Sequence, residues 1–114
     1  MVKYSSDHLD AVFAALADPT RRDILRRGSA TRMSMGEIAK PYGMSLPAIS
    51  KHVRVLEKAK FVTKTRVGRQ YVVTIQPFAF EEASSYLKGY EKLWNDRLDR
   101  LERYLSFLPG RRQK

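Results

Sequence analysis

Apolar and polar residues in the first quarter of the chain alternate with the period of amphipathic helices. Over residues 6–17 the apolar positions lie three or four residues apart, which predicts a helix with one buried side. These positions are Leu9, Val12, Phe13 and Leu16. Asp18 and Pro19 follow directly, and an aspartate suits the N-cap of a helix while a proline suits its first position. We therefore expect a second helix from Pro19 that ends near Gly28.

The middle of the chain carries the signals of two short helices joined by a turn. Ser34 and Glu37 have the spacing of a capping box, which predicts the start of a helix. Pro41 limits this helix, because its ring clashes with the carbonyl group four residues back. Gly43 provides the permissive backbone of a tight turn, and Ser45 is placed to cap the next helix.

The pattern changes at residue 61 to β-branched and aromatic residues. Two such runs, 61–67 and 71–75, lie on either side of Gly68. This arrangement predicts a β-hairpin with a glycine turn. Pro77 then closes the hairpin and begins the last helix.

The last helix, predicted over residues 77–108, has an apolar stripe with alternating spacings of three and four. Its members are Phe80, Ala83, Leu87, Tyr90, Trp94, Leu98 (or Arg97), Leu101, Leu105 and Leu108. So long a stripe is typical of a helix that meets another chain, because a domain of this size cannot cover it. An effector pocket lined by Tyr86, Tyr90 and Trp94 is the alternative. Aromatic residues at this spacing more often form a dimer core, which we favour.

Length and composition indicate a single domain over residues 1–114. Of the 114 residues 43% are apolar, which is enough for a buried core. The absence of cysteine excludes disulfides and thiolate metal sites. The sequence contains no apolar run long enough to span a membrane and no secretion-signal pattern at its N-terminus. We expect a cytoplasmic protein with no metal and no cofactor.

Positive charge is concentrated in one part of the chain. The net charge is +10, from 22 Lys and Arg against 12 Asp and Glu. Residues 45–76 hold seven basic residues and one acid, a net +6, whereas residues 77–108 hold five basic residues and six acids, a net −1. The basic segment favours an anionic partner such as nucleic acid. A solvated basic surface with no partner is the other interpretation.

The helix that begins after Ser45 divides into two faces. Its apolar face consists of Ile49, Val53 and Leu56. The opposite face is small near the helix start and basic further along, and consists of Pro47, Ser50, Lys51, Arg54 and Lys58. Small residues allow close approach to a base edge or a phosphate, and the helix N-terminus favours an anion. Together with the preceding short helix, this is the pattern of a helix-turn-helix.

Three segments, LADPTRRDIL, GEIAKPYGMSLPAISKHVRVLEKAKFV and TKTRVGRQYVV, resemble the ArsR-type winged helix-turn-helix transcriptional regulators. The resemblance extends from about Leu9 to Leu108. It implies a mainly α fold with a small β-hairpin, in which four helices precede the hairpin and a long fifth helix follows it. It also implies a homodimer joined through the first and last helices. The chain is most similar to the cysteine-free subgroup that lacks the thiolate metal site.

The resemblance assigns roles to particular residues. The DNA-facing positions on the second helix of the helix-turn-helix would be Ser45, Pro47, Ala48, Ser50, Lys51, His52 and Arg54. The wing contacts would be Arg66, Arg69 and Tyr71. The dimer contacts would be Leu9, Phe13, Leu87, Tyr90, Trp94, Leu98, Leu101 and Leu105. Residues 77–108 would form the dimerisation helix and residues 109–114 a basic tail.

Two sites keep more than one interpretation. His52 can donate to a phosphate, fill the flank of its helix, or bind a metal, although the only other histidine, His8, is distant in sequence. Arg21 and Arg22 can contact phosphate, but helix capping and surface solvation are the favoured roles.

The leading functional hypothesis is a homodimeric, sequence-specific transcriptional regulator, a repressor that binds an inverted-repeat operator in double-stranded DNA. The alternative is a winged-helix protein-interaction module that recruits another polypeptide through its long last helix. An enzyme is disfavoured, because the sequence has no Gly-rich phosphate loop, no HExxH motif and no nucleophile elbow. The sequence identifies no small-molecule effector.

Overall fold

The computed structural model describes residues 2–108, with side chains from His8 onward. The predicted basic tail, 109–114, lies outside these residues. Contacts divide the chain into two compact units, one up to Ala83 and one from Ser84 onward, and each is described by itself. That residues 1–114 form a single domain stays a prediction.

The first unit begins with two helices, α1 (Val2–Leu16) and α2 (Pro19–Gly28). α1 starts four residues earlier than the apolar pattern predicts, whereas α2 has the predicted bounds. Asp18 is the N-cap of α2, and one of its carboxylate oxygens accepts a hydrogen bond from the backbone N–H of Arg21 at 3.0 Å. This bond satisfies one of the free N–H groups at the helix start.

The helix-turn-helix consists of α3 (Met35–Ala39) and α4 (Leu46–Lys58). The α-helix ends at Ala39, before Pro41, as predicted, and a 3₁₀ turn, η1 (Lys40–Tyr42), contains the proline. Gly43 follows with φ 64°, a conformation that suits a residue without a side chain. The predicted turn is confirmed.

Both predicted caps of the helix-turn-helix are present. Ser34 accepts from the backbone N–H of Glu37, and the Glu37 carboxylate accepts from the backbone N–H of Ser34, which completes the capping box. Ser45 accepts from the backbone N–H of Ala48 at 3.3 Å. These local bonds fix where α3 and α4 begin.

The sheet has three strands, β1 (Met33–Ser34), β2 (Val62–Val67) and β3 (Gln70–Ile75), in the order β1-β3-β2. All pairs are antiparallel, and a two-residue turn that includes Gly68 joins β2 to β3. The predicted hairpin is therefore confirmed. The short β1, which pairs Met33 with Val73, is an addition to the predicted two strands.

α4 ends in a Schellman motif without glycine. The backbone N–H of Phe61 donates to the Leu56 carbonyl at 2.9 Å, and that of Lys60 donates to the Glu57 carbonyl at 3.0 Å. The motif needs a left-handed residue, and Lys60 takes this conformation with φ 68°. A side chain in this region costs about 1 kcal/mol relative to glycine.

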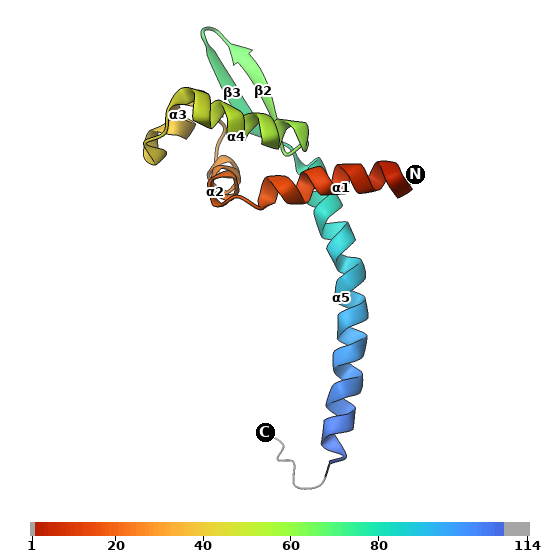
Figure 1. Cartoon of the computed structure of the whole chain (residues 1–114). Coiled ribbons are helices and arrows are strands. Elements are labelled where there is room, and N and C mark those ends of the chain that lie inside the picture. Colours follow the sequence, from red (N-terminus) through yellow and green to blue (C-terminus); the bar gives the residue numbers. More distant parts are fainter. Residues whose placement is uncertain (1, 109–114) are drawn as a thin grey trace. The chain divides into compact units, whose positions relative to one another are not determined.

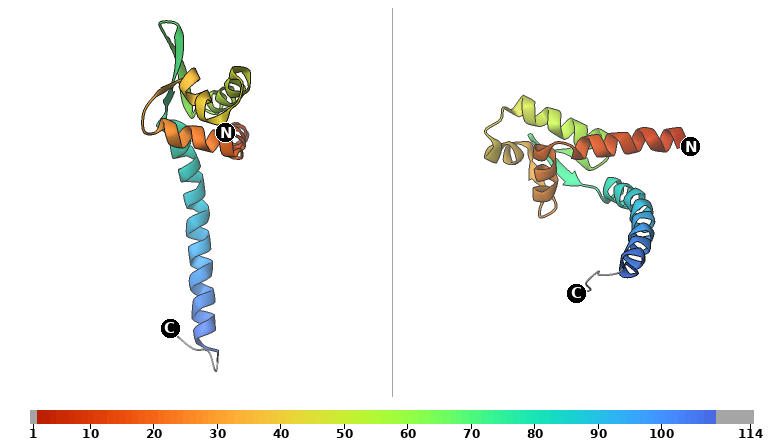
Figure 2. Two further views of the ribbon diagram at one scale, coloured as in Figure 1. Left: turned by 90° about the vertical axis from the view of Figure 1, so that its left-hand side faces the viewer. Right: turned by 60° about the horizontal axis from the view of Figure 1, so that its bottom comes forward.

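One hydrophobic core joins the elements of the first unit. Its fully buried members include Val12, Ile24, Ile38, Ile49, Val53, Leu56, Phe61 and Val62. Every helix from α1 to α4 contributes, so packing fixes α4 against α1, α2 and α3. The β2–β3 hairpin projects beyond α4 with its turn at the far end (Figures 1 and 2).

α5 (Pro77–Ser106) begins in the first unit and continues into the second. Its first two turns enter the core through Ala79 and Ala83. From Ser84 onward its side chains are exposed, except for Leu105, which is half-buried. Among the residues described, no helix is long and apolar enough to cross a membrane.

Candidate nucleic-acid interface

α4 has one buried and one exposed face. Ile49, Val53 and Leu56 are fully buried, and hydrophobic burial of this kind holds the helix on the core. The exposed face carries Pro47, Lys51, Arg54 and Lys58. The predicted division of the helix is therefore present, and its outward face is basic.

The N-terminus of α4 has an exposed apolar residue that the sequence pattern does not single out. Leu46 has 55% of its surface exposed, between Ser45 and Pro47, which are exposed as well. Leu46 precedes Ile49 by three residues, a spacing that indicates a core position, so the sequence pattern did not predict its exposure. A leucine here offers an apolar contact of the kind that the methyl group of thymine accepts.

Arg54 is oriented by its own helix. One of its terminal nitrogens, Nη1, donates to the hydroxyl of Ser50 at 3.2 Å. Ser50 lies one turn earlier, so the bond directs the guanidinium group towards the helix N-terminus. Ser50 and Ala48 are half-buried, whereas Arg54 is exposed.

The hairpin presents a second basic surface. The Tyr71 ring lies opposite Arg66 in the strand register, with the Arg66 guanidinium 5.9 Å and the Lys64 ammonium 5.2 Å from the ring centroid. Arg66 also donates from Nε to the Gly68 carbonyl at 3.1 Å. Arg69 is exposed at the turn. Cation–π contacts with Tyr71 hold two positive charges side by side on the strands.

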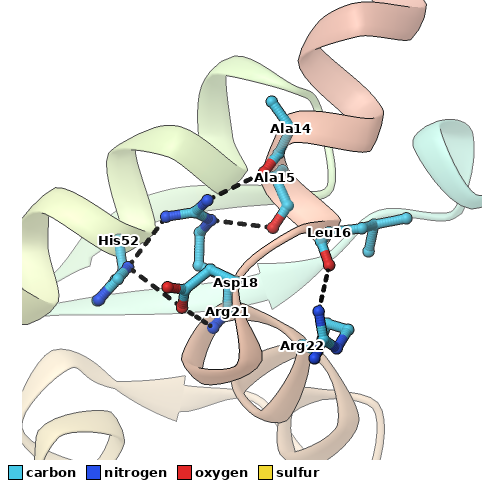
Figure 3. Close-up of polar contacts among 7 residues, drawn as sticks. All are labelled: Ala14, Ala15, Leu16, Asp18, Arg21, Arg22 and His52. Carbon is cyan, nitrogen blue, oxygen red and sulfur yellow. Dashed lines mark hydrogen bonds and ion pairs between the residues drawn. The ribbon is translucent and has the colours of Figure 1, made fainter.

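His52 lies on a different side of α4 from the basic face. Its Nδ1 atom is 3.2 Å from Nη1 of Arg21 and 3.9 Å from a carboxylate oxygen of Asp18 (Figure 3). The ring is directed at the junction of α1 and α2 and is half-buried. Of its three interpretations, this geometry favours the structural one, and the described residues contain no His, Cys, Asp and Glu group that could hold a metal.

Arg21 and Arg22 cap the end of α1. Arg21 donates to the carbonyls of Ala14 and Ala15, each at 2.9 Å, and Arg22 donates to that of Leu16 at 2.7 Å (Figure 3). The last carbonyls of a helix lack partners within it, so these bonds satisfy them. The favoured capping role is what the structure has.

The carboxyl group of Asp18 is held in its charged form. Partial burial acts to raise its pKa, but the backbone N–H and the positive charge of Arg21 oppose it, and the pKa is lowered. Asp18 therefore remains a charged acceptor at the junction of α1 and α2 to a lower pH than an ordinary aspartate would.

A second polar cluster holds the turn before α4. The Tyr42 hydroxyl donates to a carboxylate oxygen of Asp23 at 2.6 Å, and burial and this bond raise the pKa of Tyr42. Arg27 donates to the carbonyls of Ile38 and Glu37 at 3.0 and 2.9 Å, and its guanidinium lies over the Tyr42 ring. α2 thus secures the end of α3 and the turn.

The predicted dimer contacts fall into both units. In the first unit, Leu9 and Phe13 of α1 are half-buried. In the second unit, the stripe of α5 is exposed apart from Leu105, which is half-buried. The exposed fraction is 51% for Leu87, 48% for Tyr90, 55% for Trp94, 54% for Leu98 and 52% for Leu101. The hydroxyls of Tyr86 and Tyr90 lie 3.1 Å apart on this helix. Single apolar side chains are common on protein surfaces, whereas a continuous exposed row of this length indicates an interaction surface.

Known proteins with related sequences and folds agree with this geometry. The family described as a helix-turn-helix domain matches residues 16–65. The transcriptional repressor SdpR of Bacillus subtilis (strain 168) is 28% identical over 82 residues, which cover 72% of this chain and 91% of the repressor.

Two solved structures extend the comparison. The crystal structure of the ArsR-family transcriptional regulator RHA00566 matches with a TM-score of 0.75 and 34% identity, over 79% of this chain and 93% of that one. The solution structure of the homodimeric winged helix-turn-helix DNA-binding domain Mb0332 of Mycobacterium bovis matches with a TM-score of 0.61 and 26% identity. It covers 76% of this chain and 82% of the other. The elements follow the order expected from the sequence, with the helix-turn-helix first, then the wing and the long last helix. The chain belongs to the ArsR family of winged helix-turn-helix transcriptional regulators.

Proposed function

We propose that this protein is a homodimeric, sequence-specific repressor that binds an inverted-repeat operator in double-stranded DNA. In this proposal α4 enters the major groove and the β2–β3 wing follows the neighbouring backbone. Lysine and arginine neutralise phosphates and supply much of the affinity, while contacts from α4 to base edges supply the specificity.

The observation that carries the proposal is the basic outward face of α4. Lys51 and Arg54 are exposed one turn apart, over a buried row that fixes the helix to the core. Among the residues described, the side chain of Arg54 donates only to Ser50, and an arginine can donate two parallel bonds to guanine. The exposed Leu46 adds an apolar contact for thymine.

The wing supports the same docking. Tyr71 orders Lys64 and Arg66, and Arg69 is exposed at the turn. These side chains lie on a projecting hairpin outside the helix that we assign to base readout, so we assign them to phosphates. Serine and proline at the start of α4 allow its backbone to approach closely.

A homodimer accounts for the exposed stripe of α5. Mb0332, which is similar in fold, is a homodimeric domain. A two-fold axis between protomers would place two copies of α4 on one face of a duplex, with half-sites about one helical turn apart. We assign Leu9 and Phe13 of α1 to the same interface.

Substitution of the outward face of α4 tests the proposal. A duplex recovered by selection from random sequence and a scrambled duplex of the same length serve as probes in fluorescence anisotropy. Lys51→Ala or Arg54→Ala should weaken binding to the selected duplex by about 1–3 kcal/mol if either residue reads a base. Binding to the scrambled duplex should fall by less, because it lacks the specific contacts.

Lys92→Ala on α5 is a control with the same loss of charge. It should leave the preference for the selected duplex unchanged. If Lys51→Ala and Arg54→Ala bind the selected duplex as the unaltered protein does, the docking of α4 is refuted.

The exposed stripe of α5 also favours a second candidate, a module that recruits a different polypeptide. Sedimentation of the purified chain with and without duplex DNA separates the two. A dimer that binds DNA at low salt supports the repressor, whereas a monomer without affinity for DNA supports the interaction module.

A further inference from the structure

Arg21 joins the junction of α1 and α2 to α4, yet it lies outside the basic face assigned to DNA. We propose that Arg21 is a positioning residue, which sets the orientation of α4 through His52 and thereby determines how well the dimer discriminates its operator from other DNA. The inference rests on the proposed function, because it requires α4 to be the helix that reads bases.

The guanidinium group of Arg21 is fixed on α1 before it reaches α4. Its Nε and Nη2 atoms donate to the carbonyls of Ala15 and Ala14, at 2.9 Å each. A guanidinium group is planar and its donors point in fixed directions. With two nitrogens held by the end of α1, the third, Nη1, has a defined position, and it is the one that lies 3.2 Å from His52 (Figure 3).

The chemistry of the pair fixes which group donates. Arginine has only donors, so Nδ1 of His52 must accept. The imidazole ring therefore carries no proton on Nδ1 while the bond is made. Asp18 accepts from the backbone N–H of Arg21, so it fixes the main chain of Arg21 while the side chain of Arg21 reaches His52.

His52 is well placed to control the rotation of α4. It follows Lys51 directly and precedes Arg54 by two residues, on a flank between the buried and the exposed faces. Burial of Ile49 and Val53 holds the helix on the core, but hydrophobic contact is not directional. A directional bond on the flank restricts rotation about the helix axis, and such a rotation would move every side chain of the outward face.

Loss of this bond should affect specific and non-specific binding differently. Base readout requires donors and acceptors to meet within hydrogen-bond geometry. Phosphate attraction depends on charge and distance and tolerates a small displacement. The expected signature is a lower ratio of specific to non-specific affinity.

The test measures the affinities of Arg21→Ala, His52→Ala and the double variant for the selected and the scrambled duplex. Each single variant should lower the ratio of the two affinities about tenfold, a size typical of contacting residues that are coupled. The double variant should lower it no further than one single variant, because both break the same bond. Full additivity of the two effects would overturn the inference.

Arg22→Ala is the matched control. It removes the same charge and a bond to α1, at the Leu16 carbonyl, but among the residues described Arg22 makes no hydrogen bond or ion pair with α4. The ratio of its affinities for the selected and the scrambled duplex should equal that of the unaltered protein. If Arg22→Ala lowers the ratio as much as Arg21→Ala does, general weakening of α1 explains the effect and the inference is overturned.

His52→Asn provides the rescue and keeps the bonds of Arg21 to α1 intact. The asparagine side-chain oxygen lies near the place of Nδ1 and can accept from Arg21. His52→Asn should therefore retain most of the preference that His52→Ala loses, and thermal unfolding verifies that both are folded. Equal loss in both variants would overturn the inference, while an unaltered protein without any preference for the selected duplex would refute the proposed function itself.

Discussion

Replacement of Arg69 isolates the contribution of the wing to DNA binding. Arg69 is exposed at the turn of the hairpin, next to Gly68. Arg66, in contrast, is also bonded to the Gly68 carbonyl and lies by the Tyr71 ring. Arg69→Ala therefore removes one positive charge from each protomer with little effect on the strands.

The size of the effect follows from the release of counterions. If each Arg69 neutralises one phosphate, the dimer loses two such contacts. Each contact contributes about 0.9 to the slope of log K against log salt, so the slope should become shallower by about 1.8. The factor by which Arg69→Ala lowers the affinity for DNA should then shrink by about twelvefold between about 50 and 200 mM salt.

Fluorescence anisotropy titrations at several salt concentrations measure this slope. Affinity for the selected and the scrambled duplex should fall by the same factor, because phosphates carry no sequence information. Lys92→Ala should leave the slope unchanged. An unaltered slope for Arg69→Ala, or a loss confined to the selected duplex, would refute the assignment of the wing to phosphates.

Three further outcomes are expected. Lys60→Gly should raise the free energy of unfolding by about 1 kcal/mol, because Lys60 is left-handed at φ 68°, and a lower value in urea unfolding would contradict this reason. Leu98→Glu should shift the dimer towards monomer in sedimentation equilibrium, since it puts a charge in the apolar stripe, and an undiminished dimer would exclude Leu98 from the interface. The lowered pKa of Asp18 predicts a stabilising contribution that is present above the ordinary carboxyl pKa and is lost as the pH falls through the lowered one. Asp18→Asn retains an N-cap but does not titrate, so its urea midpoint should fall less steeply in acid than that of the unaltered protein. If the midpoints of both proteins fall in parallel with pH, the charge of Asp18 does not stabilise the fold.

The parts of the fold that could be predicted are those with local causes. Ser34 and Ser45 cap the helices that follow them through bonds to residues three positions on, so the sequence alone contains the signal. Gly43 and Gly68 likewise take the left-handed conformation at the predicted turns. The periodicity of α4 predicted its buried face because packing follows helical spacing.

The features that were missed depend on tertiary contacts. β1 is too short to have a pattern of its own and exists because Met33 and Ser34 meet β3. Lys60 takes a position that usually indicates glycine, since the following Phe61 is fully buried and fixes the chain. His52 has a basic sequence context that indicates a DNA contact, whereas its partner Arg21 is 31 residues away. Spacing within α4 cannot reveal such a partner.

The pairing of β1 with β3 has a mechanical consequence. Ser34 ends β1, pairs with Val72 in the wing, and is also the N-cap of α3. The wing is thereby joined to the helix-turn-helix at both edges of β3, and this double connection restricts its movement relative to α4. In the proposed docking, α4 and the wing of each protomer would therefore keep a nearly fixed separation. A mismatch in groove width would then be accommodated by bending of the duplex more than by movement within the protein.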